Sequence, residues 1–217
     1  MAVMNVNPTR MQLSKLKKQL TTAVRGHKML KDKRDELMRQ FLDLIRETRD
    51  LREKVEAELE HCNAHFVNAS AVMSKEALDA ALLSPKQQIG VQIGSKNVMS
   101  VEIPQFETET RTADKGDIFP YGFAFTSFEL DDAVTSLDTV LPDLIKLAQY
   151  EKSCELMSAE IEKTRRRVNS LEHVMIPRNQ ETIKYISMKL EENDRSSRTR
   201  LMKVKDMLLD KAHHYSA

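Results

Sequence analysis

Three residues in the first third of the chain, His61, Cys62 and His65, have types and a spacing that could bind a metal ion. On a helix, residues four positions apart share a face, and imidazole and thiolate are ordinary zinc ligands. No cysteine or carboxylate elsewhere stands at a spacing that would complete such a site. We therefore expect no metal, and we interpret the two histidines as surface residues beside a packed helix seam.

The usual sequence signatures of catalysis and cofactor binding are absent. Gly90 and Gly94 belong to an alternating segment, and no glycine-rich run precedes a Lys-Ser or Lys-Thr pair, as a phosphate-binding loop requires. His27 falls on a helix seam, where we interpret it as a polar packing residue, and His213 and His214 lie in the C-terminal tail. We predict no cofactor, and we expect that the chain by itself is not an enzyme.

The basic residues are a stronger indication of function than the histidines, because they are concentrated near the two ends of the chain. Ten of them stand between Arg10 and Arg39 against three acidic residues, and Arg195, Arg198, Arg200, Lys203 and Lys205 follow near the other end of the chain. Two interpretations stay open for this basic region: a solvated helix surface, or a surface that enters an acidic or polar partner. We do not expect nucleic-acid binding, because aromatic residues are almost absent there.

A helix that pairs with a second one must position these charges. Charged residues make up 31% of the chain, aromatic residues only 5%, and there is no Trp, which favours a long helical pair over a globule. Asn7 and Pro8 suit a helix start. Apolar residues then recur at alternating spacings of three and four, which predicts a coiled-coil helix about 80–90 Å long. This seam is Leu13, Leu16, Leu20, Ala23, His27, Leu30, Arg34, Leu37, Phe41, Leu44, Thr48, Leu51 and Val55, with a stutter to Leu59, Cys62 and Phe66.

The middle of the chain changes character. Residues 74–83 predict a short helix, ended by Ser84-Pro85, and the alternation over about 88–103 predicts a β-hairpin with its turn at 94–97. Residues 105–127 are expected to form a loop. The phenylalanines in and beside this loop either anchor it to the helices or form a docking surface; they are Phe106, Phe119, Phe123, Phe125 and Phe128.

A second seam predicts a second long helix. Pro142 could mark a break or a new first turn, and Pro177 should kink the helix because its ring removes a backbone hydrogen bond. The seam positions are Leu147, Tyr150, Cys154, Met157, Ile161, Thr164, Val168, Leu171 and Met175, then Ile183, Ile186, Leu190, Leu201, Val204 and Leu208.

The expected fold is mainly α: a long antiparallel two-helix coiled coil with a small head that contains the short helix and the hairpin. We divide the chain into an N-terminal helix (1–72), the head (73–127), a C-terminal helix (128–210) and a flexible tail (211–217), with the two termini together. No signal peptide or membrane span is expected, and the two cysteines suit a reduced, cytosolic protein.

Several stretches follow a family pattern: NVNPTRM (5–11) and TTAVRGHKMLKDKRDEL (21–37) in the first helix, and EKTRRRVNSLEH (162–173) and KLEEN (189–193) in the second. In this order they resemble the two long helices of the D subunits of bacterial V-type ATPases. Ser170 stands where many relatives have Ala. The short helix and hairpin in the middle are also what the family shows.

The resemblance implies a central rotor shaft that transmits torque between the catalytic hexamer of A and B subunits and the ion-translocating ring in the membrane. It implies binding to the F subunit and to the funnel-shaped subunit above that ring, at the cytoplasmic face of the plasma membrane and without membrane insertion. The motor would move H⁺ or Na⁺ and would couple to ATP hydrolysis or synthesis. A non-rotating coiled-coil adaptor is the alternative, and we expect such an adaptor to expose a contiguous apolar patch.

Three consecutive arginines, Arg165 to Arg167, would cover most of a helix circumference, either as a solvated surface or as a contact ring for a surrounding partner. We also expect the hairpin to tune activity. The residues expected to contact partners are Arg10, Lys28, Arg34, Arg165, Arg166, Arg167, Ile89, Val91, Ile93, Val101 and Ile103.

Overall fold

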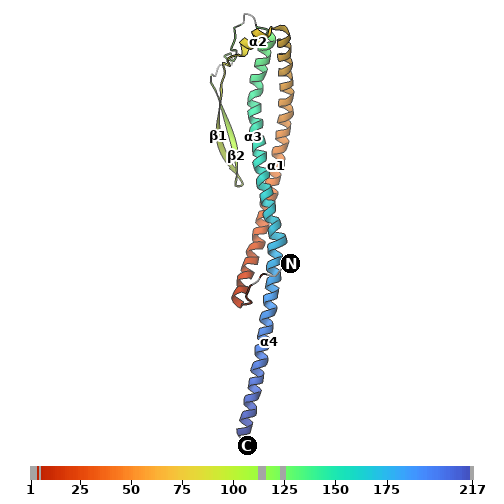
Figure 1. The fold of residues 1–217 in the computed structure, drawn as a ribbon, viewed down its shortest axis with the longest axis vertical. Helices are drawn as coiled ribbons and strands as arrows, with labels where there is room; N and C mark the ends of the chain where they lie inside the picture. Colours follow the sequence, from red (N-terminus) through yellow and green to blue (C-terminus); the bar gives the residue numbers. More distant parts are fainter. Residues whose placement is uncertain (1–3, 5, 112–115, 123–125, 216–217) are drawn as a thin grey trace. The chain divides into compact units, whose positions relative to one another are not determined.

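The described residues are mainly helical, as expected, and form two long helical runs, a short helix and a two-stranded hairpin (Figure 1). The computed structural model describes residues 4, 6–111, 116–122 and 126–215, and the side chains of these up to residue 209. Two compact units divide the chain: residues 1–34 with 163–217 (unit 1), and residues 35–162 (unit 2). The elements are α1 (Arg10–Val72), α2 (Lys75–Leu82), β1 (Ile89–Val98), β2 (Val101–Thr110), α3 (Phe128–Ser170), the π-helix η1 (Leu171–Met175) and α4 (Ile176–Tyr215).

In unit 2, α1 and α3 pair antiparallel. Contacts between the two helices advance along α1 while they retreat along α3: Thr48 Oγ1 lies 3.7 Å from Cys154 Sγ, Lys54 Nζ lies 2.6 Å from Asp143 Oδ2, and Cys62 Sγ donates to the Ala133 carbonyl at 3.4 Å. Leu37, Val55 and Met157 are buried at predicted seam positions. The 3,4 spacing therefore predicted the packed face of both helices.

The seam prediction was wrong at one end of unit 2. Phe66, placed on the seam, is 39% exposed, whereas Ala69 is completely buried. Ala69 packs with Ala81 of α2 and Leu130 of α3. Small side chains at 69 and 81 let α2 approach the helix pair closely, and this contact sets the buried face there. α2 itself is capped by Ser74, whose side chain accepts the Ala77 amide.

The hairpin differs from the sequence expectation in its register. β1 and β2 pair antiparallel from Ile89↔Thr110 to Val98↔Val101, so the turn is Met99-Ser100 and not residues 94–97. The hairpin therefore covers 89–110 rather than about 88–103, and the loop predicted over 105–127 begins only after Thr110. Both turn residues have positive φ, 51° and 70°, as in a type I′ hairpin turn, and non-glycine side chains disfavour this conformation.

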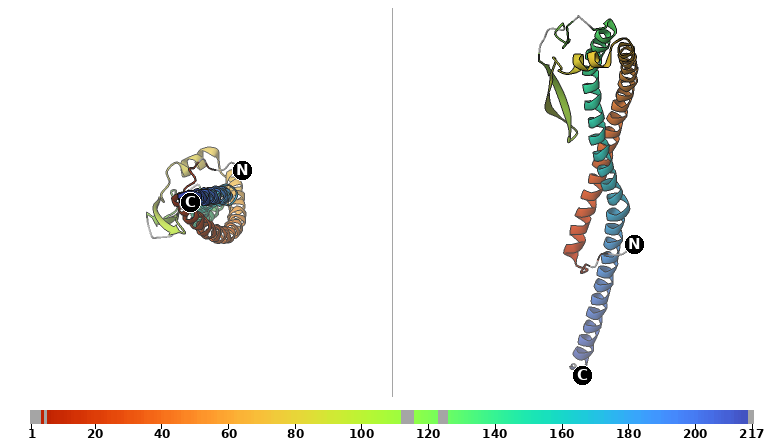
Figure 2. Two further views of the ribbon diagram at one scale, coloured as in Figure 1. Left: turned by 90° about the horizontal axis from the view of Figure 1, so that it is seen from below. Right: turned by 45° about the horizontal axis from the view of Figure 1, so that its top comes forward.

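Packing against the helices explains this register. Val101 is buried, and Met99 and Ile103 pack beside it on a cluster that includes Leu37 and Met157. Figure 2 (right) shows the two strands lying beside the paired helices of unit 2. The Asn97 side chain stabilises the turn by accepting the Ser100 amide at 3.0 Å. Burial of Val101 and partial burial of Met99 and Ile103 offset the cost of two left-handed residues, which is about 1–3 kcal/mol each. The turn-forming composition of residues 94–97 could not show that packing on the helices determines the register.

The aromatic residues in and after the hairpin differ in burial and in their contacts. Phe106 is half-buried in β2, and its amide donates to Gln149 Oε1 of α3 at 2.9 Å. Phe119 packs on Tyr121 with ring centres 6.0 Å apart, and the Tyr121 hydroxyl donates to Asp131 at 2.8 Å. These contacts anchor the segment to α3. Phe128 is 73% exposed, and Phe123 and Phe125 lie outside the described residues.

In unit 1, the start of α1 pairs antiparallel with the end of α3, with η1 and with α4. Arg10 Nη2 lies 3.0 Å from Asp194 Oδ2, and His27 Nε2 lies 3.3 Å from Glu172 Oε2. Before α1 begins, the Met4 amide donates to Thr182 Oγ1 at 3.2 Å. The expectation that the two termini lie together was wrong, because α4 continues beyond Asp194 through residues 195–215, where α1 offers it no partner (Figure 1).

The two prolines of the second long helical run behave differently. Pro142 lies inside α3, which continues through it. It therefore marks neither a break nor a new first turn, the two alternatives that the sequence left open. Pro177 follows a π-helical turn, η1, in which the Ile176 amide donates to the Leu171 carbonyl. The helical run continues, but η1 has no buried residue, and Met175, a predicted seam position, is 46% exposed.

Candidate partner-contact surfaces

All six basic residues that we expected to contact partners lie in unit 1. Arg10 is exposed and paired with Asp194, Lys28 is exposed, and Arg34 is half-buried on the seam. Arg165, Arg166 and Arg167 are all exposed on α3, between the buried residues Thr164 and Val168. The structure thus brings these six charges to one unit, on both of its helices.

The arrangement of the three arginines follows from the helix period. Thr164 and Val168 are four residues apart and face the seam, so the three residues between them must point around the remaining circumference. Within the part of the chain that the structure describes, neither Arg165 nor Arg167 pairs with a carboxylate. Guanidinium groups in this position can donate to carboxylates or carbonyls of a surrounding protein.

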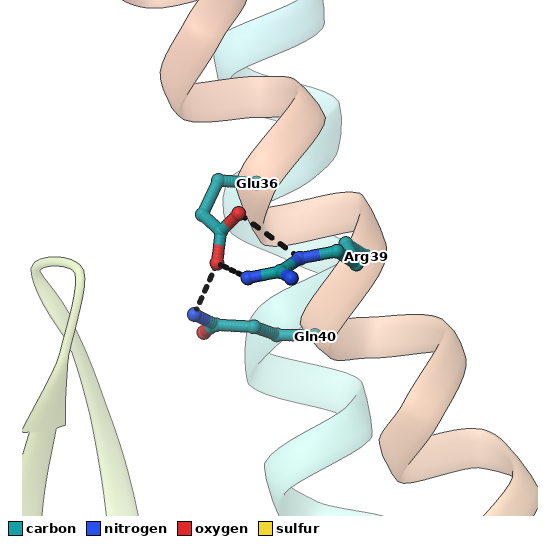
Figure 3. Close-up of polar contacts among 3 residues, drawn as sticks. All are labelled: Glu36, Arg39 and Gln40. Atoms are coloured by element: carbon teal, nitrogen blue, oxygen red, sulfur yellow. Dashed lines mark hydrogen bonds and ion pairs between the residues drawn. The ribbon is translucent and has the colours of Figure 1, made fainter.

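Other arginines are already held by their own helix. In unit 2, Arg39 donates to both oxygens of Glu36, at 2.6 and 3.1 Å, and Gln40 donates to the same carboxylate (Figure 3). The Arg39 hydrogen bonds, helped by that of Gln40, lower the pKa of Glu36, and Glu36 in turn raises the pKa of Arg39. Such local pairs reduce the charge that α1 presents to partners.

The five hairpin residues expected to contact partners split into two groups. Val101 is buried and Ile103 packs with it on the helices of unit 2, so both stabilise the fold. Ile89 is half-buried at the other end of the hairpin. Val91 and Ile93 are exposed, by 45% and 74%, and these two side chains are available to another protein.

Two of the three residues that raised the question of a metal have structural partners. Cys62 is buried against the Ala133 carbonyl, and His65 Nδ1 lies 3.2 Å from Glu129 Oε2. His61 is exposed. Among residues that the structure describes, no group of three His, Cys, Asp or Glu side chains could hold a metal ion.

One exposed apolar surface, which lies near the end of α4, was not predicted from the sequence. Beyond Asp194, α4 presents large apolar side chains that are 48–69% exposed: Leu201, Met202, Val204, Met207, Leu208 and Leu209. We had placed Leu201, Val204 and Leu208 on a packed seam. Their spacing continues the seam, but α1 begins at Arg10 and does not reach them. Comparing the lengths of the two predicted helices could have shown that the first helix does not reach this face, which has no partner helix among the described residues.

No helix within the described ranges contains a stretch that is long and apolar enough to cross a membrane. The exposed apolar face of residues 201–209 is interrupted by Lys203, Lys205 and Asp206, so it is amphipathic. An amphipathic helix of this kind suits a groove or sleeve in another protein.

Comparison with known proteins identifies the family. The family model described as the D subunit of ATP synthase matches residues 12–206. A V-type ATP synthase D subunit of Acetivibrio thermocellus is 60% identical over 215 residues, which cover 99% of this chain and 97% of the relative. The protein of the same name from Clostridioides difficile is 56% identical over 212 residues, 98% of this chain and 95% of the relative. The similarity extends over both units, and the chain belongs to the family of ATP synthase D subunits.

Proposed function

We propose that the protein is the central rotor shaft of a V-type ATP synthase, a subunit without a catalytic site of its own. The similarity to V-type ATP synthase D subunits along nearly the whole chain is the observation that carries this proposal. In this role unit 1 enters the hexamer of A and B subunits at the cytoplasmic face of the membrane. Unit 2 binds the F subunit and the funnel-shaped subunit above the membrane ring.

The exposed apolar face of residues 201–209 supports the insertion. Side chains such as Leu201 and Leu208 gain free energy when a partner removes them from water, about 25 cal/mol for each Å² of apolar surface. A shaft that turns also needs contacts that break and form again, and the exposed Arg165–Arg167 ring can exchange one carboxylate for another at low cost. We therefore assign the apolar face to seating in the hexamer and the arginine ring to guiding its rotation.

The first test is assembly. The purified chain, mixed with F, A and B subunits, should form a one-to-one complex with the F subunit that enters an A–B hexamer on size exclusion and changes its rate of ATP hydrolysis. A chain that stays alone, or that binds the F subunit without entering the hexamer, would contradict the proposal.

The apolar face can be tested within the same complex. We expect Leu201→Gln, Val204→Gln and Leu208→Gln together to release the chain from the hexamer while binding to the F subunit is unchanged. Thr199→Gln, Lys203→Gln and Asp206→Asn form the control, because they alter exposed polar positions of the same segment. Equal binding by the two triple variants would show that the apolar face does not seat the shaft.

The hairpin is proposed to tune hydrolysis. The Arg111 amide donates to the Gln88 carbonyl at 3.0 Å, so the two ends of the hairpin meet and the chain can be rejoined after residues 89–110 are removed. The deletion also removes Val101 and Ile103 from the core of unit 2, so folding of the variant is checked by circular dichroism before the assay. Deletion should change the hydrolysis rate of the assembled complex. An unchanged rate in a complex of normal composition would refute this role.

A fixed adaptor remains the second candidate, because the exposed apolar side chains of residues 201–209 can equally dock on a partner that does not rotate. Both roles predict binding, and only the shaft predicts rotation during hydrolysis. Rotation is therefore the observation that separates them.

A further inference from the structure

The paired helices of unit 1 are loosely packed at the level of η1. There η1 of the second helical run faces residues 22–27 of α1, and no η1 residue is buried. On α1, no side chain from Lys17 to Arg34 is buried either, although Ala23 and His27 are half-buried. A groove of about 650 Å³ lies between the two helices, with Ala23 and Gly26 on one side and Leu171, Met175 and Asn179 on the other.

The second helical run is weakened at this level by Pro177. Proline has no amide hydrogen, so the carbonyl of His173, four residues earlier, loses its helical donor, and the proline ring presses on that turn. The Ile176 amide bonds to the Leu171 carbonyl instead, five residues back, which makes the turn π-helical. The hydrogen-bond ladder continues across the site, but with wider geometry and no buried side chain to hold it.

The facing helix is weakened at the same level by Gly26. A Cβ built on Gly26 would meet no atom within 4 Å, so packing does not require glycine here. Glycine in a helix interior is less stable than alanine, because its backbone gives up more conformational freedom on folding. Next to it, His27 contacts Glu172 of η1 at 3.3 Å through a polar pair that water can replace.

We propose that residues 22–27 and 171–177 form a flexible joint, where the paired helices of unit 1 bend or twist more readily than on either side. Two independent features, a glycine without a packing role and a π-turn before proline, face one another across one loosely packed groove. The joint is a property of the isolated chain.

Hydrogen exchange of the purified full chain, followed by mass spectrometry, tests the joint without any partner. We expect amides of residues 172–180 to exchange at least about tenfold faster than those of 161–169 and 182–190, because local opening sets the exchange rate. Equal protection along this whole segment would overturn the proposal, whatever the chain does in a motor.

Two variants test the cause. Gly26→Ala should slow exchange in α1 around position 26 and in η1 opposite it, by about two- to fivefold, because the two sides open together. Pro177→Ala should slow exchange in the same two segments. Ser14→Ala is the control, since it raises the helix propensity of α1 at an exposed position that does not line the groove. If Ser14→Ala protected η1 as much as Gly26→Ala did, the joint would not be localised and the proposal would fail.

Discussion

Leu37 offers the sharpest test of how unit 2 holds together. Its side chain is completely buried in the cluster with Val101, Met157 and Ile161, where the hairpin meets both helices. Leu37→Ala removes the transfer free energy of the lost methyl and methylene groups and leaves a cavity, a combination that ranges over about 2–5 kcal/mol in packed cores. The neighbours Phe41, Leu44 and Met99 are only partly buried and can relax into the space, so we expect about 2–3 kcal/mol.

Leu42→Ala is the matched control, because Leu42 stands on the same helix and is 47% exposed. The change in helix propensity is the same in both variants, so the difference between them isolates burial. We expect Leu42→Ala to lose less than about 1 kcal/mol.

The assay is urea unfolding of the purified chain followed by far-ultraviolet circular dichroism, with the m value compared between variants. Because the two units could unfold separately, hydrogen exchange within unit 2 provides a second measurement. If Leu37→Ala lost no more stability than Leu42→Ala, the cluster under the hairpin turn would not support unit 2, and our explanation of the hairpin register would be wrong.

Four further results are expected. Gly26→Ala should stabilise the chain by about 0.5–1 kcal/mol in urea unfolding, and a loss of stability would mean that the glycine has a packing role. Thr182→Val should cost about 0.5–1.5 kcal/mol, because Thr182 is buried and accepts the Met4 amide; Thr199→Val, at an exposed position, should cost less. The Lys54 hydrogen bond lowers the pKa of Asp143, so the Lys54–Asp143 pair stabilises the fold fully above the ordinary pKa of an aspartate. This stabilisation is lost as the pH falls through the lowered pKa. Asp143→Asn should therefore lose less stability than the parent on acidification from near pH 7 to near pH 3. Changing Arg165, Arg166 and Arg167 to Gln should reduce assembly or hydrolysis in the full complex, whereas Arg46, Arg49 and Arg52, which pair with carboxylates of their own helix, should tolerate the same change.

The sequence predicted those parts of the fold that depend on a single repeating pattern. The seam from Leu13 to Val55 is buried or half-buried throughout, because a stripe of this length can be covered in only one way, by a second helix. On the second helical run, the predicted seam residues Val168 and Ile186 are buried for the same reason. The short helix after residue 74 was also predicted correctly, since a serine cap and a following Ser-Pro mark its ends locally.

The parts that failed depend on competition between local and distant contacts. Residues 94–97 have turn chemistry, but the packing of Met99 and Val101 on the helices moves the turn to Met99-Ser100. Pro177 was expected to kink its helix; a π-helical turn precedes it, which was not foreseen from the sequence, and the kink itself stays a prediction. Leu201 and its neighbours have seam spacing, yet spacing alone does not show whether a partner helix reaches that far.

Of the residues that were expected to contact partners, structure separates those that stabilise the fold from those that are accessible. Val101 and Ile103 face the helices of unit 2, while Val91, Ile93 and Arg165 face solvent. Side-chain type could not make this distinction, because valine and isoleucine stand at both kinds of position.

Rotation is the most direct test of the central claim. The A–B hexamer would be fixed to a surface, and a bead attached to the bound chain through Ser84→Cys, an exposed position of unit 2, with Cys154 changed to Ser and the buried Cys62 left in place. A rotor shaft predicts that the bead turns in one direction when ATP is added and stops when ATP is removed. A chain that stays bound while the hexamer hydrolyses ATP, with a bead that does not turn, would contradict the rotor function and leave the fixed adaptor in its place.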